Sequence, residues 1–419
     1  MAGMAGWEAE CVIVGGGIGG AVLALALGRQ GHRVILLERE PQPSAAVRPE
    51  VLAKSTIEVF QRLGAGERIL REAAIPLQGL ELRRSGRGRL LGFSQDDFRR
   101  VGAQPYSTDP ARTRQILLEH AERCVEILRG VEVRELLREG TRVAGVRGLR
   151  GQESVEVRAA LVIGDDGGRS RIREGLGIPL AVEEFPMDFL AAAGPAALPD
   201  AIGQAWLNPA GVRSGLFGGI FLPLPGQRVA MVFLLSPASY ERFKQSAPSA
   251  FYDAAARLAP PCADLVRRHP FPDGFARIRR PFGHAPRYVA DGAALLGDAA
   301  HPVTPAGGQG ANMSVADAAA LAEVAHEALA QRDCSAHRLT GYETIRRSAN
   351  RRSLQFSVRT AATLQLLGAL PWTAPLLLWL LSRVERSPAT KARFIQAVSQ
   401  AFRSTAPSPP ALHAEAASK

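Results

Sequence analysis

The chain has 419 residues, 46% of them hydrophobic, so it is long enough for two or three domains and a sizeable core. The net charge is +11, yet only four of the 51 basic residues are lysines, and the arginines are dispersed without interleaved aromatic residues, which argues against a nucleic-acid-binding surface. The four cysteines show no metal-ligand or disulfide-framework spacing, so the sequence predicts no metal site.

The first predicted elements form a nucleotide-binding unit. A strand over residues 10–14 leads into GGGIGG, an apolar helix follows over 21–31, and a second strand over 33–37 ends at an acid. In Gly-x-Gly-x-x-Gly spacing, the first glycine makes the turn, the second admits a pyrophosphate and the third packs helix on strand. The final acid can accept from a ribose hydroxyl. This unit predicts dinucleotide binding, either FAD or NAD, by Gly15, Gly17, Ile18, Gly20, Glu38 and Arg39.

Two further helices are expected before the chain returns to this sheet. Arg48 precedes a helix predicted over 55–63, and the ordinary alternative is a surface arginine before an amphipathic helix. Arg112 begins a second helix over 112–123. Short strands then lead back to the nucleotide-binding sheet at residues 161–163.

A second strand, loop and helix follow that returning strand. Asp166-Gly167 precedes Ser170 and Arg173, which gives the pattern Asp-Gly-x-x-Ser-x-x-Arg. Gly167 permits a left-handed turn. Asp166 can then reach cofactor phosphates indirectly or hold Arg48.

A third loop begins after a strand over residues 293–296. Gly297-Asp298 leads into a segment rich in Pro and Gly, and a helix begins near Gln309. Such a helix start carries roughly +0.5 charge and unpaired N–H groups, so it favours an anion or a ring that becomes anionic. Asp298 can accept from a ribityl chain. Alone, this would be an ordinary capped turn; after two nucleotide-type loops, it predicts a site for a large, partly anionic ring system.

The three loops together resemble those of the single-component FAD-dependent monooxygenases of the para-hydroxybenzoate hydroxylase type. GGGIGG with Glu38, DGGRSRIR and GDAAHPVTPAGGQGAN span residues 11–320 in the family's order. The resemblance implies an α/β fold: a Rossmann-like FAD-binding domain with an inserted antiparallel-sheet substrate domain and C-terminal helices. The implied parts are 8–178 and 286–335 for the FAD-binding domain, 179–285 for the substrate domain, 336–403 for the helices and 404–419 for a disordered tail.

The resemblance also implies roles for individual residues. Arg48 matches an arginine near the flavin, and Asp298 matches the aspartate on the FAD ribitol. The segment under the isoalloxazine supplies Pro305, Gly308, Gly310, Ala311 and Asn312; no catalytic side chain is assigned beyond Pro305 and Gly308 of this flavin loop, and His301 is expected to be structural.

Two positions depart from the family pattern. Pro110 stands where relatives often carry Gln or Arg, so a cofactor contact there falls to Arg112 or is missing. Ser314 stands in place of a usual glycine and is expected to change helix packing slightly.

The implied reaction uses FAD, O₂, and NADPH or NADH as a transient co-substrate, since the sequence contains one dinucleotide fingerprint. A flavin C4a-hydroperoxide would deliver one oxygen atom to a hydrophobic aromatic, quinolone- or quinone-like, or prenylated substrate by hydroxylation or epoxidation in secondary metabolism. Two alternatives stay open: an FAD-dependent prenyl reductase of the geranylgeranyl type, and a non-catalytic GDI-like binding protein.

The region after residue 178 is predicted to form an antiparallel sheet. Strands are expected over 205–207, 214–222 and 228–235. Four apolar side chains on these strands are candidate pocket walls, or equally ordinary sheet core: Phe217, Phe221, Met231 and Phe233.

The C-terminal region contains an uncharged stretch over residues 360–382, which Pro371 and Pro375 prevent from forming one straight helix. Three interpretations remain: helices packed on the FAD domain, a monotopic surface or hydrophobic dimer interface over 360–386, or a membrane span. With no basic leader before the first strand, we expect a cytoplasmic monomer or homodimer, possible peripheral contact with the cytoplasmic membrane, a small hydrophobic substrate and no nucleic-acid partner.

Overall fold

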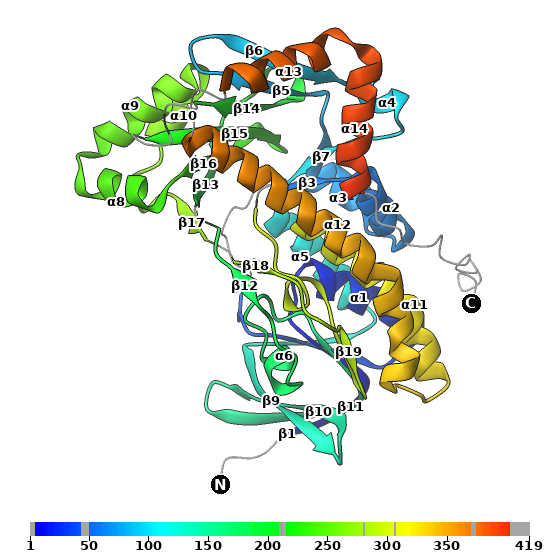
Figure 1. Ribbon diagram of the computed structural model, residues 1–419. Helices are drawn as coiled ribbons and strands as arrows, with labels where there is room; N and C mark the ends of the chain where they lie inside the picture. Colours follow the sequence, from blue (N-terminus) through cyan, green and yellow to red (C-terminus); the bar gives the residue numbers. More distant parts are fainter. Residues whose placement is uncertain are drawn as a thin grey trace.

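The computed structural model describes residues 5–42, 50–185, 187–208, 211, 215–279, 281–305, 307–369 and 374–402. Arg48 and the tail 404–419 lie outside these residues, so the expectations for them stay predictions. The described chain forms two large sheets and two small ones, and the long helix α12 (Ala336–Ala369) runs diagonally across the two large sheets in Figure 1.

The first sheet carries the nucleotide-type loops. Its central strands are parallel, because β1 (Ala5–Val14) pairs with both β2 (Val34–Glu38) and β11 (Glu153–Gly164). The predicted return of the chain at residues 161–163 is therefore confirmed. The order β19-β20-β11-β1-β2-β8 is completed by β19 (Val289–Ala290), β20 (Ala293–Leu295) and β8 (Glu126–Arg129), with β9 (Val131–Glu139) and β10 (Arg142–Arg150) as an antiparallel extension from β11.

Apolar helices cover this sheet and bury its core. Helix α1 (Ile18–Arg29) packs on α5 (Pro110–Ala121) and α11 (Gly310–Ala330). Parallel strands that helices cover on both faces have nearly continuous apolar sequences. In agreement with this pattern, all five residues of β2 are buried. The structure confirms the Rossmann-like architecture that the loops predicted.

The second sheet is mostly antiparallel and follows the order β17-β13-β16-β15-β14-β5-β6. Its strands are β5 (Gly79–Arg84), β6 (Gly88–Ser94), β13 (Asp188–Pro195), β14 (Ile202–Leu207), β15 (Leu216–Leu224), β16 (Arg228–Leu235) and β17 (Ala276–Ile278). The hairpin β5–β6 comes from within the segment predicted as the first FAD part, so this sheet extends beyond residues 179–285.

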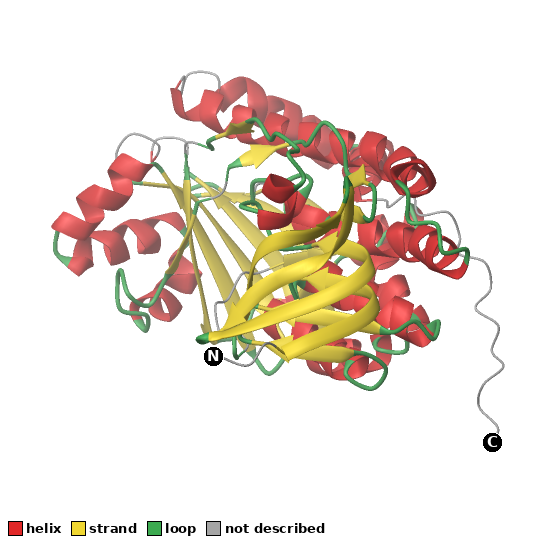
Figure 2. Ribbon diagram, turned by 90° about the horizontal axis from the view of Figure 1, so that it is seen from below, coloured by secondary structure: helices red, strands yellow, loops and turns green. Residues whose placement is uncertain are grey.

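One face of the second sheet is covered by short helices, which Figure 2 shows on its outer side. These are α8 (Pro237–Gln245), α9 (Pro248–Leu258) and α10 (Ala263–Arg267). Phe221, Met231 and Phe233 are buried against these helices, while Phe217 belongs to a separate buried cluster. Of the two interpretations, ordinary sheet core holds for Phe221, Met231 and Phe233, because alternation along a strand does not reveal which face a helix will cover. Phe217 is also fully buried, in the cluster against which Ile220 packs.

Smaller elements connect the two sheets. They are β3 (Glu50–Leu52), β7 (Tyr106–Thr108) and β4 (Ala74–Pro76) in one sheet, β12 (Val182–Glu183) and β18 (Phe282–Gly283) in another, the helices α2 (Lys54–Arg62), α3 (Gly66–Glu72), α4 (Gln95–Arg100) and α6 (Arg171–Gly175), and the single turns η1 (Pro199–Ala201), η2 (Pro260–Cys262) and η3 (Gly297–Ala299).

The last helices cover the free end of the second sheet. Helix α13 (Ala374–Arg386) lies over β6, and α14 (Pro388–Phe402) descends beside α4 (Figure 1). Glu385 fastens α13 to the sheet, because its carboxylate accepts the Gly92 N–H at 2.9 Å and contacts Lys391 at 3.0 Å. Within the described part of the chain, no helix combines the length and the apolar character needed to cross a membrane.

Candidate functional site

The glycine-rich turn after β1 requires its glycines for steric reasons. Gly15 has a φ of 108°, and a Cβ there would lie 2.2 Å from the carbonyl oxygen of Asp165. A Cβ on Gly20 would lie 2.1 Å from the carbonyl oxygen of Gly15. Both contacts are impossible for a side chain, so the turn keeps β1 close to α1. Gly17 precedes the first helical residue, Ile18, and the N-terminus of α1 therefore presents backbone N–H groups at the turn.

Glu38 closes one side of this turn. Glu38 is the last residue of β2, and its side chain is buried. Its carboxylate accepts the N–H of Gly16 at 3.0 Å and that of Glu40 at 2.9 Å. Arg114 bridges the same two parts: its guanidinium donates to Glu38 at 2.6 Å and to the carbonyl of Gly16 at 2.5 Å. The turn thus has an acid and a cation at one edge, as a ribose and a pyrophosphate require.

The predicted cofactor residues Arg112 and Arg39 both pair with acidic side chains in this structure. Residues two apart on a helix do not share a face, so Arg112 faces away from Arg114 and instead contacts Glu72 and Glu119. Arg39 is exposed and pairs with its neighbour Glu40 at 3.3 Å. Nothing in the sequence favoured Arg114 over Arg112, because the direction in which each side chain points depends on how α5 packs.

The second loop is held by its own side chains. Asp166 accepts the N–H groups of Arg171 at 2.7 Å and Ile172 at 3.2 Å, so its carboxylate caps α6. Arg173 is buried and donates to the carbonyl of Ala299 at 3.0 Å, which joins this loop to the third. Asp165, which the sequence analysis did not single out, accepts the N–H of Gly20 at 2.8 Å and joins this loop to the first.

The third loop begins with Asp298 in η3 and reaches α11. Gly308 has a φ of 63°, and a Cβ on it would meet open space, whereas one on Gly307 would approach the Phe356 ring to 3.2 Å. The N–H of Gly308 donates to Pro305 at 3.1 Å. Helix α11 then starts at Gly310, one residue after the predicted position, so two glycines and the buried Gln309 lead to the N-terminus of a long helix.

Asn312 in the first turn of α11 is a structural clamp. Its side-chain oxygen accepts the N–H of Ala53 at 2.9 Å and the hydroxyl of Thr56 at 2.7 Å, and its amide donates to Val51 at 2.9 Å. Its neighbour Ala311 is buried. The side chain of Asn312 therefore fixes β3 and α2 beside the third loop, and any contact with a cofactor would come from its backbone.

A buried polar cluster supports the third loop from below. Asp317 accepts from His301 at 2.5 Å, from Arg346 at 2.7 Å and from Asn350 at 2.9 Å. Burial would raise the pKa of Asp317, but the charges and hydrogen bonds of His301 and Arg346 outweigh it and lower that pKa to about 2. His301 therefore serves as a partner of Asp317, in line with its expected structural role.

A cavity of ≈ 550 Å³ lies beside these loops. One wall is the face of the second sheet opposite α9, and the opposing walls come from β3, α2, α4 and the last two helices. The apolar residues of its sheet wall are Leu80, Leu82, Leu91, Phe93, Ala205, Ile220 and Leu222, the same strands also contribute Glu81 and Gln204, and Leu381, Phe394 and Ile395 close it from α13 and α14. The segment Val51–Ala53 belongs both to this cavity and to the Asn312 clamp, which places the cavity next to the start of α11.

The charged residues along this cavity are Lys54, Glu58 and Glu81. Lys54 pairs with Glu58 at 3.6 Å at the edge. The Glu81 side chain is held by Arg83 at 2.6 Å, and alternation along β5 directs both to the face opposite Leu80 and Leu82. The sheet wall of the cavity is therefore apolar.

Comparisons with known proteins agree with this geometry. A family model described as FAD binding domain matches residues 8–357. The 6-methylpretetramide 4-monooxygenase of Streptomyces rimosus is 30% identical over 364 residues, 84% of either chain. The 3-demethoxyubiquinol 3-hydroxylase of Escherichia coli is 27% identical over 337 residues, 75% of this chain and 79% of that one. The crystal structure of Pseudomonas aeruginosa PqsL in complex with 2-aminobenzoylacetate has a TM-score of 0.74 at 25% identity, covering 86% of this chain and 97% of PqsL.

Proposed function

This chain belongs to the FAD binding domain family and is an FAD-dependent monooxygenase, and on that premise we propose that it oxygenates an uncharged, extended aromatic substrate in the apolar cavity. The similarities give no support to a prenyl reductase or a non-catalytic binding protein. The observation that carries the proposal is the apolar sheet wall of the cavity, which lies beside the flavin loop.

The three loops fit FAD part by part. Glu38 would accept from the adenosine ribose, and the turn from Gly15 to Gly20, with Arg114, would hold the pyrophosphate. Asp298 would accept from the ribitol. The side-chain-free backbone at Gly308 leaves room for the isoalloxazine against the N-terminus of α11, whose dipole stabilises negative charge on the ring. Bound FAD supplies the redox chemistry with NAD(P)H and O₂. The protein positions the substrate at the flavin and excludes water from the site.

The substrate class follows from charge and shape. A carboxylate buried in this cavity would need a cation, but Lys54 is paired with Glu58 at the edge and Arg83 lies on the other face of β5. Burial of apolar surface must therefore provide most of the affinity. The cavity falls in the size range of sites for drug-sized molecules. The names of the relatives point to a pretetramide and a ubiquinol, and we propose a polyketide-like or quinol-like aromatic for this chain.

Substrate-stimulated NAD(P)H oxidation with stoichiometric O₂ uptake tests this proposal. Uncharged polycyclic phenols and quinols should stimulate it, and the same ring systems bearing a carboxylate should not. Leu82→Trp should raise KM or abolish stimulation without loss of flavin, because the indole would fill the cavity. Arg87→Trp, at the exposed turn of the β5–β6 hairpin, is the matched control. Stimulation by carboxylated aromatics alone, or an unchanged Leu82→Trp enzyme, would contradict the proposal.

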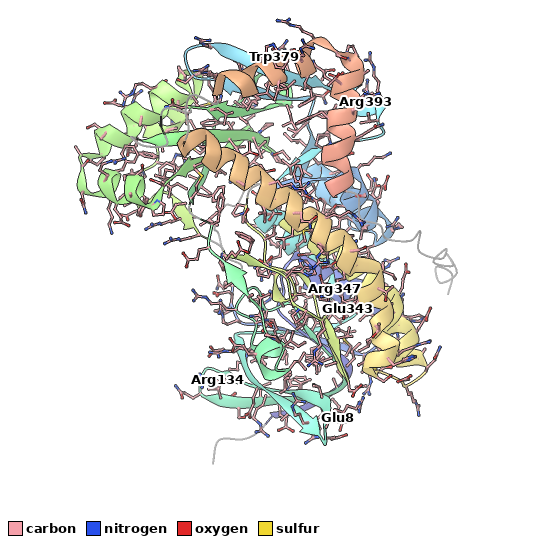
Figure 3. The ribbon with its side chains drawn as sticks, in the orientation of Figure 1. Glu8, Arg134, Glu343, Arg347, Trp379 and Arg393 are labelled. Atoms are coloured by element: carbon pink, nitrogen blue, oxygen red, sulfur yellow. The ribbon has the colours of Figure 1, made fainter. Side chains whose placement is uncertain are left out.

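We also propose a peripheral contact of α13 with an anionic lipid surface. Trp379 and Leu380 are half-exposed on this helix, and the Arg383 guanidinium lies 4.5 Å from the Trp379 ring centre. Figure 3 shows Trp379 and Arg393 at the same end of the molecule, on α13 and α14. Co-sedimentation with anionic vesicles, lost in a Trp379→Ser variant, would support this contact. Binding to neither anionic nor neutral vesicles, with dimers in light scattering, would instead assign the face to a second copy.

A further inference from the structure

The Asp165 carboxyl lies directly beneath the glycine-rich turn. One of its oxygens accepts the Gly20 N–H at 2.8 Å, and a Cβ on Gly17 would come within 2.9 Å of the same oxygen. The other oxygen lies toward the third loop: a Cβ on Gly297 would be 3.0 Å from it and 2.7 Å from the Ser314 hydroxyl. The carboxyl therefore lies between the first turn of α1 on one side and the contact of η3 with α11 on the other.

The charges around this carboxyl are mostly negative. Asp166 follows it in the same loop, Asp298 approaches from η3, and Asp317 approaches from α11. Burial raises the pKa of Asp165 well above its usual range, the Gly20 N–H opposes this, and the three neighbouring acids raise it further. A negative charge on Asp165 is therefore already unfavourable before any cofactor is added.

The cations of this region are engaged elsewhere. Arg173, from α6, donates to the carbonyl of Ala299, and Arg346, from α12, binds Asp317. Helix α1 has no acidic residue in its first turn. Its last turn contains Arg29, which lies at the opposite end of the helix from Asp165. Tyr342 also approaches from α12, and burial raises its pKa well above the usual range, so the phenol is neutral.

We propose that Asp165 is neutral whenever FAD occupies the glycine-rich turn, so that FAD binding takes up a proton from solution at any pH at which this carboxyl is ionised in FAD-free protein. This rests on the proposed placement of the pyrophosphate at the turn from Gly15 to Gly20. The pyrophosphate brings two further negative charges to the turn whose Gly20 N–H already contacts this carboxyl. Protonation converts the carboxylate to a carboxylic acid with no redox change. One oxygen keeps the Gly20 hydrogen bond, and the other carries the proton on the side of Ser314.

The proposal predicts the direction in which FAD affinity changes with pH. Where the carboxyl is already neutral in FAD-free protein, the affinity does not depend on pH. At higher pH, FAD-free protein loses the proton while FAD-bound protein keeps it, so the dissociation constant should rise about tenfold per pH unit. Asp165→Asn mimics the neutral acid, since an amide oxygen can still accept from Gly20.

The experiment dilutes FAD-loaded enzyme and measures released FAD by its fluorescence from about pH 6 to about pH 9, without substrate. Wild-type enzyme should show a slope of log Kd against pH approaching one over part of this range. Asp165→Asn should give a flat profile and bind FAD at least about tenfold more tightly than wild type at the upper end. Asp166→Asn, a change in the acid that caps α6, should keep the slope while its onset moves to lower pH, because one of the neighbouring negative charges is lost.

A second variant tests the same carboxyl without changing it. Asp298→Asn removes a neighbouring charge, so the pH at which FAD affinity begins to fall should move down even if FAD binds more weakly throughout. A flat wild-type profile, an Asp165→Asn profile with the wild-type slope, or an unmoved onset in Asp298→Asn would overturn the proposal. Because no substrate is present, failure of the substrate proposal leaves this test intact. Release of FAD that is unchanged by Gly15→Ala would instead refute the placement of the cofactor.

Discussion

Replacing Asp317 with Asn tests whether the buried polar cluster holds the flavin loop in place. Asp317, His301 and Arg346 are at most 2% exposed, so the Arg346 charge has almost no contact with water. The carboxylate is its counter-charge, at 2.7 Å from Nε. Removing one partner of a buried ion pair costs about 3–5 kcal/mol, a large part of the roughly 5–15 kcal/mol that stabilises a typical domain.

The assay is urea unfolding of the FAD-loaded enzyme, followed by circular dichroism and by flavin release. Asp317→Asn should lower the free energy of unfolding by about 3–5 kcal/mol. The double variant Asp317→Leu with Arg346→Met removes both charges and should cost less than the single change, although His301 and Asn350 still lose a partner. A loss below about 1 kcal/mol in the single variant, or an equal loss in both, would refute the argument.

The pH dependence gives an independent check on the same group. The pKa of Asp317 is lowered from 3.8 to about 2, so its contribution is complete above the unfolded pKa near 4 and is lost as the pH falls toward 2. Wild-type enzyme should therefore lose more stability than Asp317→Asn between about pH 4 and about pH 2. Parallel curves would show that Asp317 contributes no such linkage.

Two further predictions concern single side chains. Arg114→Ala should weaken FAD binding about tenfold by removing a charge-assisted contact at the turn, while Arg112→Ala should leave FAD affinity unchanged; equal effects of the two in a fluorescence titration would contradict the assignment. A maleimide reagent should label native protein at Cys124 alone, because the other three thiols are buried and burial raises the pKa of Cys262 to about 11; intact mass and peptide mapping would reveal a second label.

Local chemistry explains which parts of the site were predictable. The glycine turn and Glu38 follow from steric rules that act over a few residues, and the structure places them together. The start of α11 was predicted to within one residue because small residues without a further proline follow Gln309. Helix α1 begins three residues before the predicted position, at Ile18, because the last two glycines of GGGIGG are already helical.

What could not be predicted depends on packing between distant segments. Arg112 and Arg114 lie on the same helix, and only the docking of α5 on α1 decides which of them reaches Glu38. Likewise, β14 and β15 alternate or run apolar, but the sequence does not reveal that α8 to α10 cover the face with Phe221. The hairpin at residues 79–94 joins the second sheet by parallel pairing of β5 with β14, a contact across more than a hundred residues.

The same long-range packing explains why the cavity and the flavin loop form one site. Asn312 binds β3 and the start of α2 through its side-chain oxygen and amide, so the cavity wall at Val51–Ala53 cannot move independently of the first turn of α11. The same amide also donates to the carbonyl of Gly308 at 3.4 Å. Arg173 fixes the second loop to the carbonyl of Ala299, and Asp165 fixes it to the first loop. The second loop therefore holds both of the other loops through its own side chains. A change in any one of these connections should alter both flavin position and cavity shape, and so should act on FAD affinity and on substrate coupling together.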